Sequence, residues 1–164
     1  MSVTIRPATA GDLGAINGIY NHYVERSTAT FALEAMTARE RMSWWSVHEG
    51  AYPVLVAERA DEVVGWACLS PYSDRGGYRF TVEDSVYVAH DAQRQGLGRT
   101  LLAQVLSLGR SAGFRQVIAK IESSQTASLN LHHAVGFRTM GRFEQVGEKF
   151  GRVLDTELLQ LGLV

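Results

Sequence analysis

The chain has 164 residues, of which 46% are hydrophobic and 20% charged, a balance typical of a folded protein with one sizeable core. Sixteen basic and 17 acidic residues give a formal net charge of −1, which argues against nucleic-acid binding, and the single cysteine, Cys68, excludes an internal disulfide. No apolar run is long enough for a membrane span, and the segment 1–6 lacks the apolar stretch of a secretion signal. We therefore expect one domain, residues 1–164, that works in the cytoplasm without a membrane or nucleic-acid partner.

The hydrophobic pattern of the N-terminal half predicts a strand, two helices and a β-hairpin. Asp12 stands where the first helix would be capped, and the apolar residues after it recur at helical spacing as far as Val24. Thr37 and Glu40 have the spacing of a capping box, which predicts the start of the second helix. The strands are expected at residues 3–6, 53–58 and 63–70, with a turn at 59–62 between the last two.

The C-terminal half is expected to begin with a strand–loop–helix unit. A run of β-branched and aromatic residues predicts a strand at 80–88. A loop with Gly96 and Gly98 follows, and a leucine-rich helix begins at once and ends near Gly113. The remaining elements are a strand at 116–121, a helix at 126–135 and strands near 137–143 and 153–161, so the whole chain predicts a mixed α/β fold.

The glycine loop is suited to an anion. Glycine lets a ligand approach the backbone closely, and the free N–H groups at a helix start carry partial positive charge. Together they favour a phosphate or pyrophosphate site, to which Arg94 and Arg99 add charge. The loop lacks the lysine of a Walker A motif and the third glycine of a dinucleotide-binding loop, and a tight turn without a ligand is the alternative.

Two signatures at the right separation resemble the GNAT acetyltransferase superfamily. Residues 93–98, Gln-Arg-Gln-Gly-Leu-Gly, look like its Gln/Arg-x-x-Gly-x-Gly/Ala loop, and residues 125–137 look like its short helix that ends in Gly-Phe. Segments 21–24, 27–31, 81–88 and 149–152 further resemble the phosphinothricin N-acetyltransferase branch. Within this branch, segments 121–123, 131–133 and 145–155 look most like the bacterial enzymes that acetylate methionine sulfoximine and methionine sulfone. The resemblance covers almost the whole chain. It implies a mixed, mostly antiparallel sheet flanked by about four helices, with splayed strands at the CoA site.

The resemblance also implies that acetyl-CoA is the cosubstrate. The glycine loop would hold the pyrophosphate of CoA, and backbone N–H groups near the end of the strand at 80–88 would stabilise the oxyanion formed during transfer. Gln125 replaces an asparagine that contacts CoA in many relatives, which is a conservative change. The residues expected to bind acetyl-CoA are Val86, Tyr87, Val88, Gln93, Arg94, Gln95, Gly96, Leu97, Gly98, Arg99, Gln125 and Ser128.

Acetyl transfer to an amine requires a base, because an α-ammonium group is mostly protonated at pH 7. Glu83 should face the opposite side of its strand from Val82 and Asp84. The resemblance places it at the acceptor pocket, with a water relaying the proton; a solvated carboxylate is the alternative. His132 stands where many relatives have a tyrosine that protonates the leaving thiolate, and a structural pair with His133 is the alternative. Two adjacent histidines without further ligands make a poor metal site, so no metal is expected.

The acceptor side is defined by fewer residues. Arg75 or another arginine would pair with an amino-acid carboxylate, although an unpaired surface arginine is the alternative. Phe150 stands where herbicide-detoxifying relatives carry histidine, and Val153 where related sequences usually have tryptophan, so the acceptor itself stays open. The residues expected to line the acceptor pocket are Phe31, Arg75, Gly76, Gly77, Tyr78 and Tyr87.

These observations predict an N-acetyltransferase that transfers acetyl directly, in a ternary complex, to the α-amine of a small amino-acid analogue. The resemblance implies a homodimer in which one subunit completes the pocket of the other. The alternatives are transfer to another amine, such as a polyamine, an aminoglycoside or a protein N-terminus, and a CoA-binding sensor without turnover.

Overall fold

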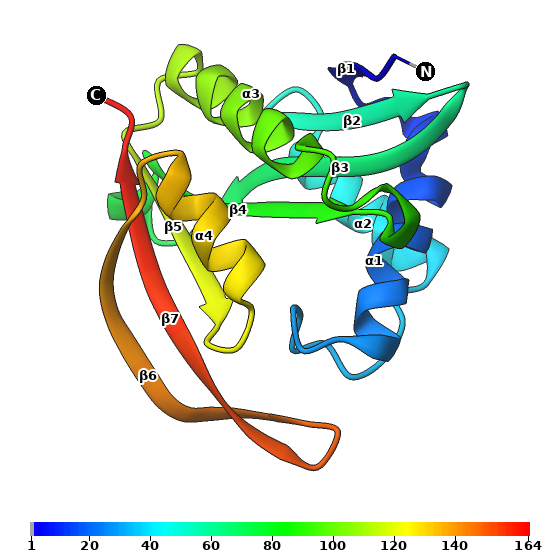
Figure 1. Ribbon diagram of the computed structural model, residues 1–164. Coiled ribbons are helices and arrows are strands. Elements are labelled where there is room, and N and C mark those ends of the chain that lie inside the picture. The colour runs from blue at the N-terminus through cyan, green and yellow to red at the C-terminus, as the bar shows by residue number, and fades with distance from the viewer. Residues whose placement is uncertain (1) are drawn as a thin grey trace.

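The structure, a computed structural model, describes residues 2–164 and is built around a seven-stranded sheet (Figure 1). The strands follow the order β1-β2-β3-β4-β5-β7-β6, and every neighbouring pair is antiparallel except β4 and β5. The predicted mixed, mostly antiparallel α/β fold is therefore confirmed. The strands are β1 (Thr4–Pro7), β2 (Val54–Arg59), β3 (Glu62–Pro71), β4 (Thr81–Val88), β5 (Gln116–Glu122), β6 (Arg138–Lys149) and β7 (Arg152–Gly162).

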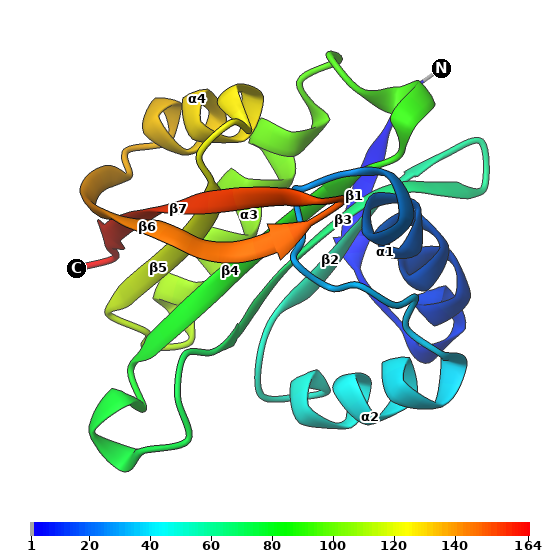
Figure 2. The ribbon, with the colours of Figure 1, turned by 90° about the horizontal axis from the view of Figure 1, so that it is seen from below.

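Four α-helices cover the two faces of this sheet, α3 and α4 on one face and α1 and α2 on the other (Figure 2). Each buried leucine or valine contributes about 1.5–3 kcal/mol to the free energy of unfolding. Along β4 the side chains alternate, so Val82 lies in the core under α3, whereas Tyr87 packs against the core under α1 and α2. The helices are α1 (Leu13–Arg26), α2 (Ala38–His48), α3 (Leu97–Ser111) and α4 (Thr126–Ala134), with short 3-10 turns at Ala10–Asp12, Gly76–Tyr78 and His90–Ala92.

Both helix starts lie where the sequence predicts, with Asp12 as the N-cap residue of α1, but of these two helices only α2 is capped by its N-cap side chain. Thr37 Oγ1 accepts the N–H of Glu40 at 3.2 Å, and Glu40 Oε2 accepts the N–H of Thr37 at 2.7 Å, so the predicted capping box is confirmed. Asp12 does not cap α1 with its side chain. Its carboxylate instead accepts the N–H of Thr9 at 2.7 Å, because a 3-10 turn precedes the helix.

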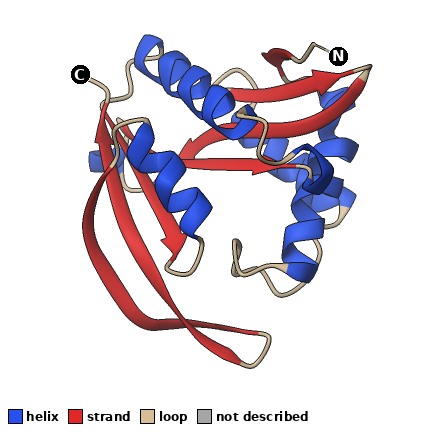
Figure 3. Cartoon of the chain, in the orientation of Figure 1, coloured by secondary structure: helices blue, strands red, loops and turns tan. Residues whose placement is uncertain are grey.

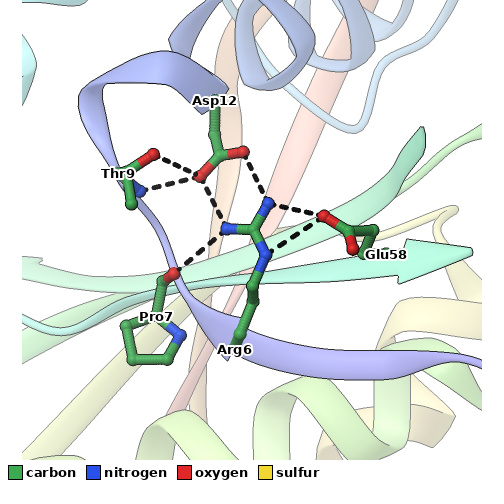
Figure 4. A network of polar contacts seen from close by, with 5 residues as sticks. All are labelled: Arg6, Pro7, Thr9, Asp12 and Glu58. Carbon is green, nitrogen blue, oxygen red and sulfur yellow. Dashed lines mark hydrogen bonds and ion pairs between the residues drawn. The ribbon is translucent and has the colours of Figure 1, made fainter. Parts of the chain in front are cut away.

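The carboxylate of Asp12 belongs to a network that joins the start of α1 to the β1–β2 edge (Figure 4). The guanidinium of Arg6 donates to both Asp12 oxygens at 2.9 Å and to Glu58 Oε2 at 2.6 Å. The hydrogen bonds from Arg6 lower the pKa of Asp12 to about 2, against the opposite effect of burial. A pKa shift of this size adds about 2 kcal/mol to the free energy of unfolding. This stabilisation is complete above the unfolded-state pKa of Asp12, and it is lost as the pH falls through the folded-state pKa.

The sheet divides between β4 and β5. Three residue pairs join these strands, the last of them Glu83 with Ile118. Beyond it the strands diverge (Figure 1), and within residues 2–164 no strand pairs with this edge of β4 over residues 84–88. β5 continues to pair with β7 as far as Glu122. The backbone therefore opens into a V with Glu83 at its apex, and we call this space the β4–β5 opening.

The last two strands are longer than the sequence predicts. Strands were expected at 137–143 and 153–161, but β6 and β7 form a curved hairpin from Arg138 to Gly162 (Figure 3). Almost every residue of β6 is exposed, and its register shifts near Gly141 and Gly147. An exposed, irregular strand shows no clear alternation of apolar and polar residues, which is why its length was underestimated. In the described part of the chain, no helix has the length and apolar character needed to cross a membrane.

Candidate active site

The loop after β4 ends in a left-handed glycine at the start of α3. Gly96 is the N-cap of the helix with φ +78°, and Arg94 also has a positive φ, of +60°. The N–H groups of the first helical turn have no acceptor within the helix, and the helix dipole adds positive charge there. Arg94 and Arg99 are exposed beside this turn. The geometry thus fits an anion such as a pyrophosphate.

Gly98 serves close packing at the same helix start. A Cβ atom at this position would lie 3.3 Å from Leu131 Cδ2 and 3.8 Å from Val88 Cγ2. The first turn of α3 therefore approaches both β4 and α4 closely. Leu97, the first residue of α3, is buried in the core. The second glycine of the loop brings the helix start to the β4–β5 opening.

Gln93 and Gln95 use their side chains to hold the loop in place. Gln93 Nε2 donates to the Tyr23 hydroxyl at 2.7 Å, and that hydroxyl donates to the carbonyl oxygen of Val88. Gln95 Oε1 accepts from Arg59 at 3.0 Å. Burial raises the pKa of Tyr23, which keeps its hydroxyl protonated and able to donate. Sequence reasoning did not identify Tyr23 as a site residue, although it belongs to the segment 21–24 that supports the family resemblance.

On the other side of the opening, the loop that follows α1 is attached to β5 through Glu122 and to the start of α4 through Gln125. Gln125 Nε2 donates to Thr28 Oγ1 at 2.9 Å, and Thr28 Oγ1 donates to Glu122 Oε2 at 2.9 Å. Burial alone would raise the pKa of Glu122, but hydrogen bonds from Ser124 and Thr28 outweigh it and lower the pKa. Sequence reasoning did not identify Thr28 and Glu122 as site residues, although segments 27–31 and 121–123 support the family resemblance, because their contact joins residues far apart in the chain.

The same loop also reaches the β6–β7 hairpin. Lys149 Nζ donates to the carbonyl oxygen of Thr30 at 2.8 Å. The ring of Phe31 packs so closely on Gly147 that any Cβ atom there would overlap it. The loop therefore joins α1 to both β5 and β6, and it places the half-exposed Phe31 between α1 and the hairpin.

Glu83 lies at the apex of the opening and has one charged partner. Its side chain faces away from Val82, which is buried under α3, so the predicted orientation of Glu83 is confirmed. Its Oε2 accepts from Lys120 Nζ at 2.9 Å, and both side chains are partly exposed, at 31% and 43%. The Lys120 ammonium also lies 5.5 Å from the ring centre of Tyr72. Sequence reasoning missed Lys120, although alternation along β5 gives it the same face as Glu122.

The other residues expected at the acceptor pocket divide into two groups. Arg75, Gly76, Gly77 and Tyr78 are exposed in the turn between β3 and β4, where Tyr78 packs on Tyr72 at a ring-centre distance of 5.1 Å. The Tyr87 ring instead lies in an aromatic cluster with Tyr20, Tyr23 and Trp66, and burial raises its pKa. Phe150 and Val153 lie at the end of the β6–β7 hairpin and are 56% and 62% exposed.

His132 is buried in α4 and pairs with Asp84 of β4. Its Nδ1 lies 2.7 Å from the carbonyl oxygen of Ser128, and its Nε2 lies 2.9 Å from Asp84 Oδ2. The carbonyl oxygen is an acceptor, and so is Asp84 as a carboxylate, so this geometry favours a proton on both ring nitrogens, as in an imidazolium. Burial lowers the pKa of His132, but the hydrogen bond and charge of Asp84 outweigh it and raise the pKa above 6.5. This geometry favours a structural pair, formed with Asp84 and not with His133; the general-acid role stays a prediction.

Comparison with known proteins agrees with this geometry. A model of the acetyltransferase (GNAT) family matches residues 16–137. The L-methionine sulfoximine/L-methionine sulfone acetyltransferase of Salmonella typhimurium is 40% identical over 162 residues, which cover 98% of this chain and 95% of that protein. The phosphinothricin N-acetyltransferase of Alcaligenes faecalis is 44% identical over 159 residues, which cover 96% and 81%. The structure of yncA from Salmonella typhimurium, solved with its cofactor acetyl-CoA, has a TM-score of 0.97 at 39% identity and covers 100% of this chain and 95% of that one.

The fold, the site and these relatives define an enzyme that transfers an acetyl group from acetyl-CoA to an amine. The chain belongs to the acetyltransferase (GNAT) family. Its own residues fit acetyl-CoA, because the left-handed Gly96 presents the start of α3 to a pyrophosphate beside an unpaired strand edge. Over residues 2–164, no three His, Cys, Asp or Glu side chains are grouped so that they could hold a metal ion.

The buried imidazolium predicts a pH-dependent loss of stability in His132→Phe. Removing one partner of a buried ion pair leaves the Asp84 carboxylate uncompensated, so the free energy of unfolding should fall by about 3 kcal/mol near pH 6. The pKa of His132 is raised in the folded state, so its contribution is full below the unfolded-state pKa of 6.5 and is lost as the pH rises through the folded-state pKa. The difference from the parent should therefore shrink as the pH rises, which urea unfolding at several pH values measures.

His133→Phe is the matched control, because His133 is the exposed neighbour on the same helix. Its free energy of unfolding should stay within about 0.5 kcal/mol of the parent value. Equal stabilities of parent and His132→Phe across the pH range would contradict the buried ion pair.

Proposed function

We propose that this N-acetyltransferase acts on the α-amine of a small amino-acid analogue of the methionine sulfoximine, methionine sulfone or phosphinothricin type. The observation that carries the proposal is the partly exposed Glu83 carboxylate at the apex of the β4–β5 opening. Relatives that match almost the full chain carry the names of enzymes for these compounds. The domain would comprise residues 1–164 and work in the cytoplasm.

On the cosubstrate side, acetyl-CoA supplies an acetyl group activated as a thioester. The N–H groups at residues 96–99 would hold its pyrophosphate, and Arg94 and Arg99 would add charge. The free edge of β4 over residues 86–88 offers backbone N–H groups toward the opening, where they would stabilise negative charge on the acetyl oxygen. Gln125 and Ser128 complete this side from the start of α4.

The acetyl group would pass directly to the amine in a ternary complex. A covalent acetyl-enzyme would need an accessible nucleophile such as a thiolate. The single cysteine, Cys68, is fully enclosed in the core under α1 and α2, and burial raises the pKa of its thiol to about 11. Its thiol therefore stays protonated and out of reach, which supports direct transfer.

On the acceptor side, Glu83 would take the proton that the ammonium group must lose. Lys120 occupies Oε2, and no described residue donates to the other carboxylate oxygen, Oε1. That oxygen can accept the proton directly or through one water. Phe31 and the turn of Arg75–Tyr78 would line the remainder of the acceptor pocket.

Glu83→Gln should lower kcat about 100-fold at neutral pH, because an amide cannot accept the proton. The measurement is free-thiol release from acetyl-CoA with a panel of amines that contains methionine sulfoximine, methionine sulfone, phosphinothricin, spermidine, an aminoglycoside and an alanine peptide. Glu62→Gln is the control, since Glu62 is exposed in the hairpin between β2 and β3. A Glu83→Gln variant as fast as the parent would exclude Glu83 as the base.

The same panel tests the acceptor assignment. Release with the three amino-acid analogues, and little with the other amines, supports it. No release with any analogue would exclude the proposed substrate class. Acetyl-CoA binding without release for any amine would instead favour a sensor.

We further propose that the enzyme is a homodimer formed through the β6–β7 hairpin. An exposed edge strand with a row of apolar side chains is prone to association unless it is covered. Phe31 packs on Gly147 of this hairpin, so a second copy seated there would lie next to the acceptor pocket. The exposed apolar residues of the hairpin are Met140, Phe143, Val146, Phe150 and Val153.

Sedimentation equilibrium should give twice the chain mass of 18.0 kDa for the parent at micromolar concentration. Phe143→Asp combined with Val146→Asp should give the mass of one chain, because two buried charges would oppose the interface. Val47→Asp on α2 is the control, since Val47 is comparably exposed and lies outside the hairpin. A parent with the mass of one chain would contradict the proposed dimer.

A further inference from the structure

Lys120 reaches across the apex of the β4–β5 opening. It lies on β5 two residues beyond Ile118, the last residue that pairs with β4. Its ammonium nevertheless meets Glu83 of β4 at 2.9 Å, and the pair stays partly exposed. Exposed ion pairs contribute little to folding stability. This contact can therefore be exchanged for a ligand without loss of the fold.

The surroundings of Lys120 hold its ammonium in place and leave donors available. The Tyr72 ring lies 5.5 Å from Nζ, a distance at which a cation is attracted to an aromatic face. Its neighbour across the sheet on β7, Leu158, carries no charge. An ammonium has three N–H donors, and one of them meets Glu83. No other hydrogen bond from Nζ exists among the described residues, so two donors are available to a bound anion.

Two other charged residues are relevant to binding an acceptor: Glu122, which is already hydrogen-bonded, and Arg75, which is exposed in the turn between β3 and β4. Glu122, on the same face of β5, is buried and accepts from Thr28 and Ser124. The side chain of Arg75 is exposed and forms no hydrogen bond within the described chain. Lys120 is thus the cation in direct contact with the proposed base, whereas Arg75 is a rival site for an acceptor anion.

We propose that Glu83 and Lys120 form a two-point receptor for the α-amino and α-carboxylate groups of the acceptor. This inference rests on the proposed function and names the residue that selects its substrate class. The ammonium and carboxylate groups of an amino acid are opposite in charge to the two members of this pair. Glu83 would bind the ammonium group, and Lys120 would bind the carboxylate. The carboxylate draws Lys120 away from Glu83 Oε2, so both Glu83 oxygens become available to the proton of the ammonium group. Polyamines lack the carboxylate and would place a cation near Lys120.

The test compares methionine sulfone with methionine sulfone amide, which has the same amine but a neutral amide in place of the carboxylate. For the parent, kcat/KM should favour the acid by about 10- to 100-fold, as expected for one charge-assisted hydrogen bond. Lys120→Met should remove this preference, so that the ratio of kcat/KM for the acid to kcat/KM for the amide falls to about one; any effect on Glu83 itself changes both values together and leaves the ratio unaffected. Lys120→Arg should restore part of the preference, because it keeps the charge.

Arg75→Met is the matched comparison. If Arg75→Met abolished the preference and Lys120→Met retained it, the carboxylate would bind at Arg75 and the proposal would be wrong. A parent that acetylates the acid and the amide equally would also overturn the proposal, while leaving amine acetylation intact. If the parent acetylated neither compound, the proposed substrate class would be wrong, and the two-point receptor that rests on it would be wrong as well. Urea unfolding of Lys120→Met should match the parent, which separates recognition from folding.

Discussion

The end of the pairing between β4 and β5 is the constraint on which the rest of the structure depends. Backbone N–H and C=O groups without a partner are costly unless a ligand, water or side chain satisfies them. The divided sheet is held open by contacts on both sides: Tyr23 binds the Val88 carbonyl, His132 binds Asp84, and Thr28 binds Glu122. Each contact joins a helix or loop to one of the two strands. The opening is therefore built into the fold, and the glycine loop and Glu83 take their positions from it.

Much of this fold follows from local patterns. The order of strands and helices, the capping box at Thr37 and the hairpin at 59–62 are all readable from spacing and turn residues. The turn at the start of α3 is readable for the same reason, since Gly96 and Gly98 lie close together in the sequence, and its use as an anion site stays a prediction. The length of β6 was not readable, because an exposed edge strand has little apolar alternation. Asp12 does occupy the predicted N-cap position of α1, but its side chain pairs with Arg6 of another element, a contact that no local pattern predicts.

The parts of the site that sequence reasoning missed are contacts between distant segments. Lys120 meets Glu83 across 37 positions in the chain, and Thr28 meets Glu122 across 94. No local pattern predicts such contacts, because the two partners of each lie far apart in the sequence. His132 shows the reverse case: its position suggested chemistry, yet the structure gives it two acceptors and a buried ion pair. Family resemblance predicts the reaction, whereas the contact between Lys120 and Glu83, on which the proposed acceptor recognition rests, is visible only in the folded chain.

The central claim is that acetyl-CoA binds along the free edge of β4 as well as at the glycine loop. Hydrogen–deuterium exchange with and without acetyl-CoA tests it most directly, since both segments are followed in one experiment. We expect slower amide exchange at residues 84–88 and at residues 96–99 when acetyl-CoA is bound, with little change in β1 and β2. Protection at the loop alone, with unchanged exchange over residues 84–88, would contradict the assignment of the β4–β5 opening as the place where the acetyl group is held.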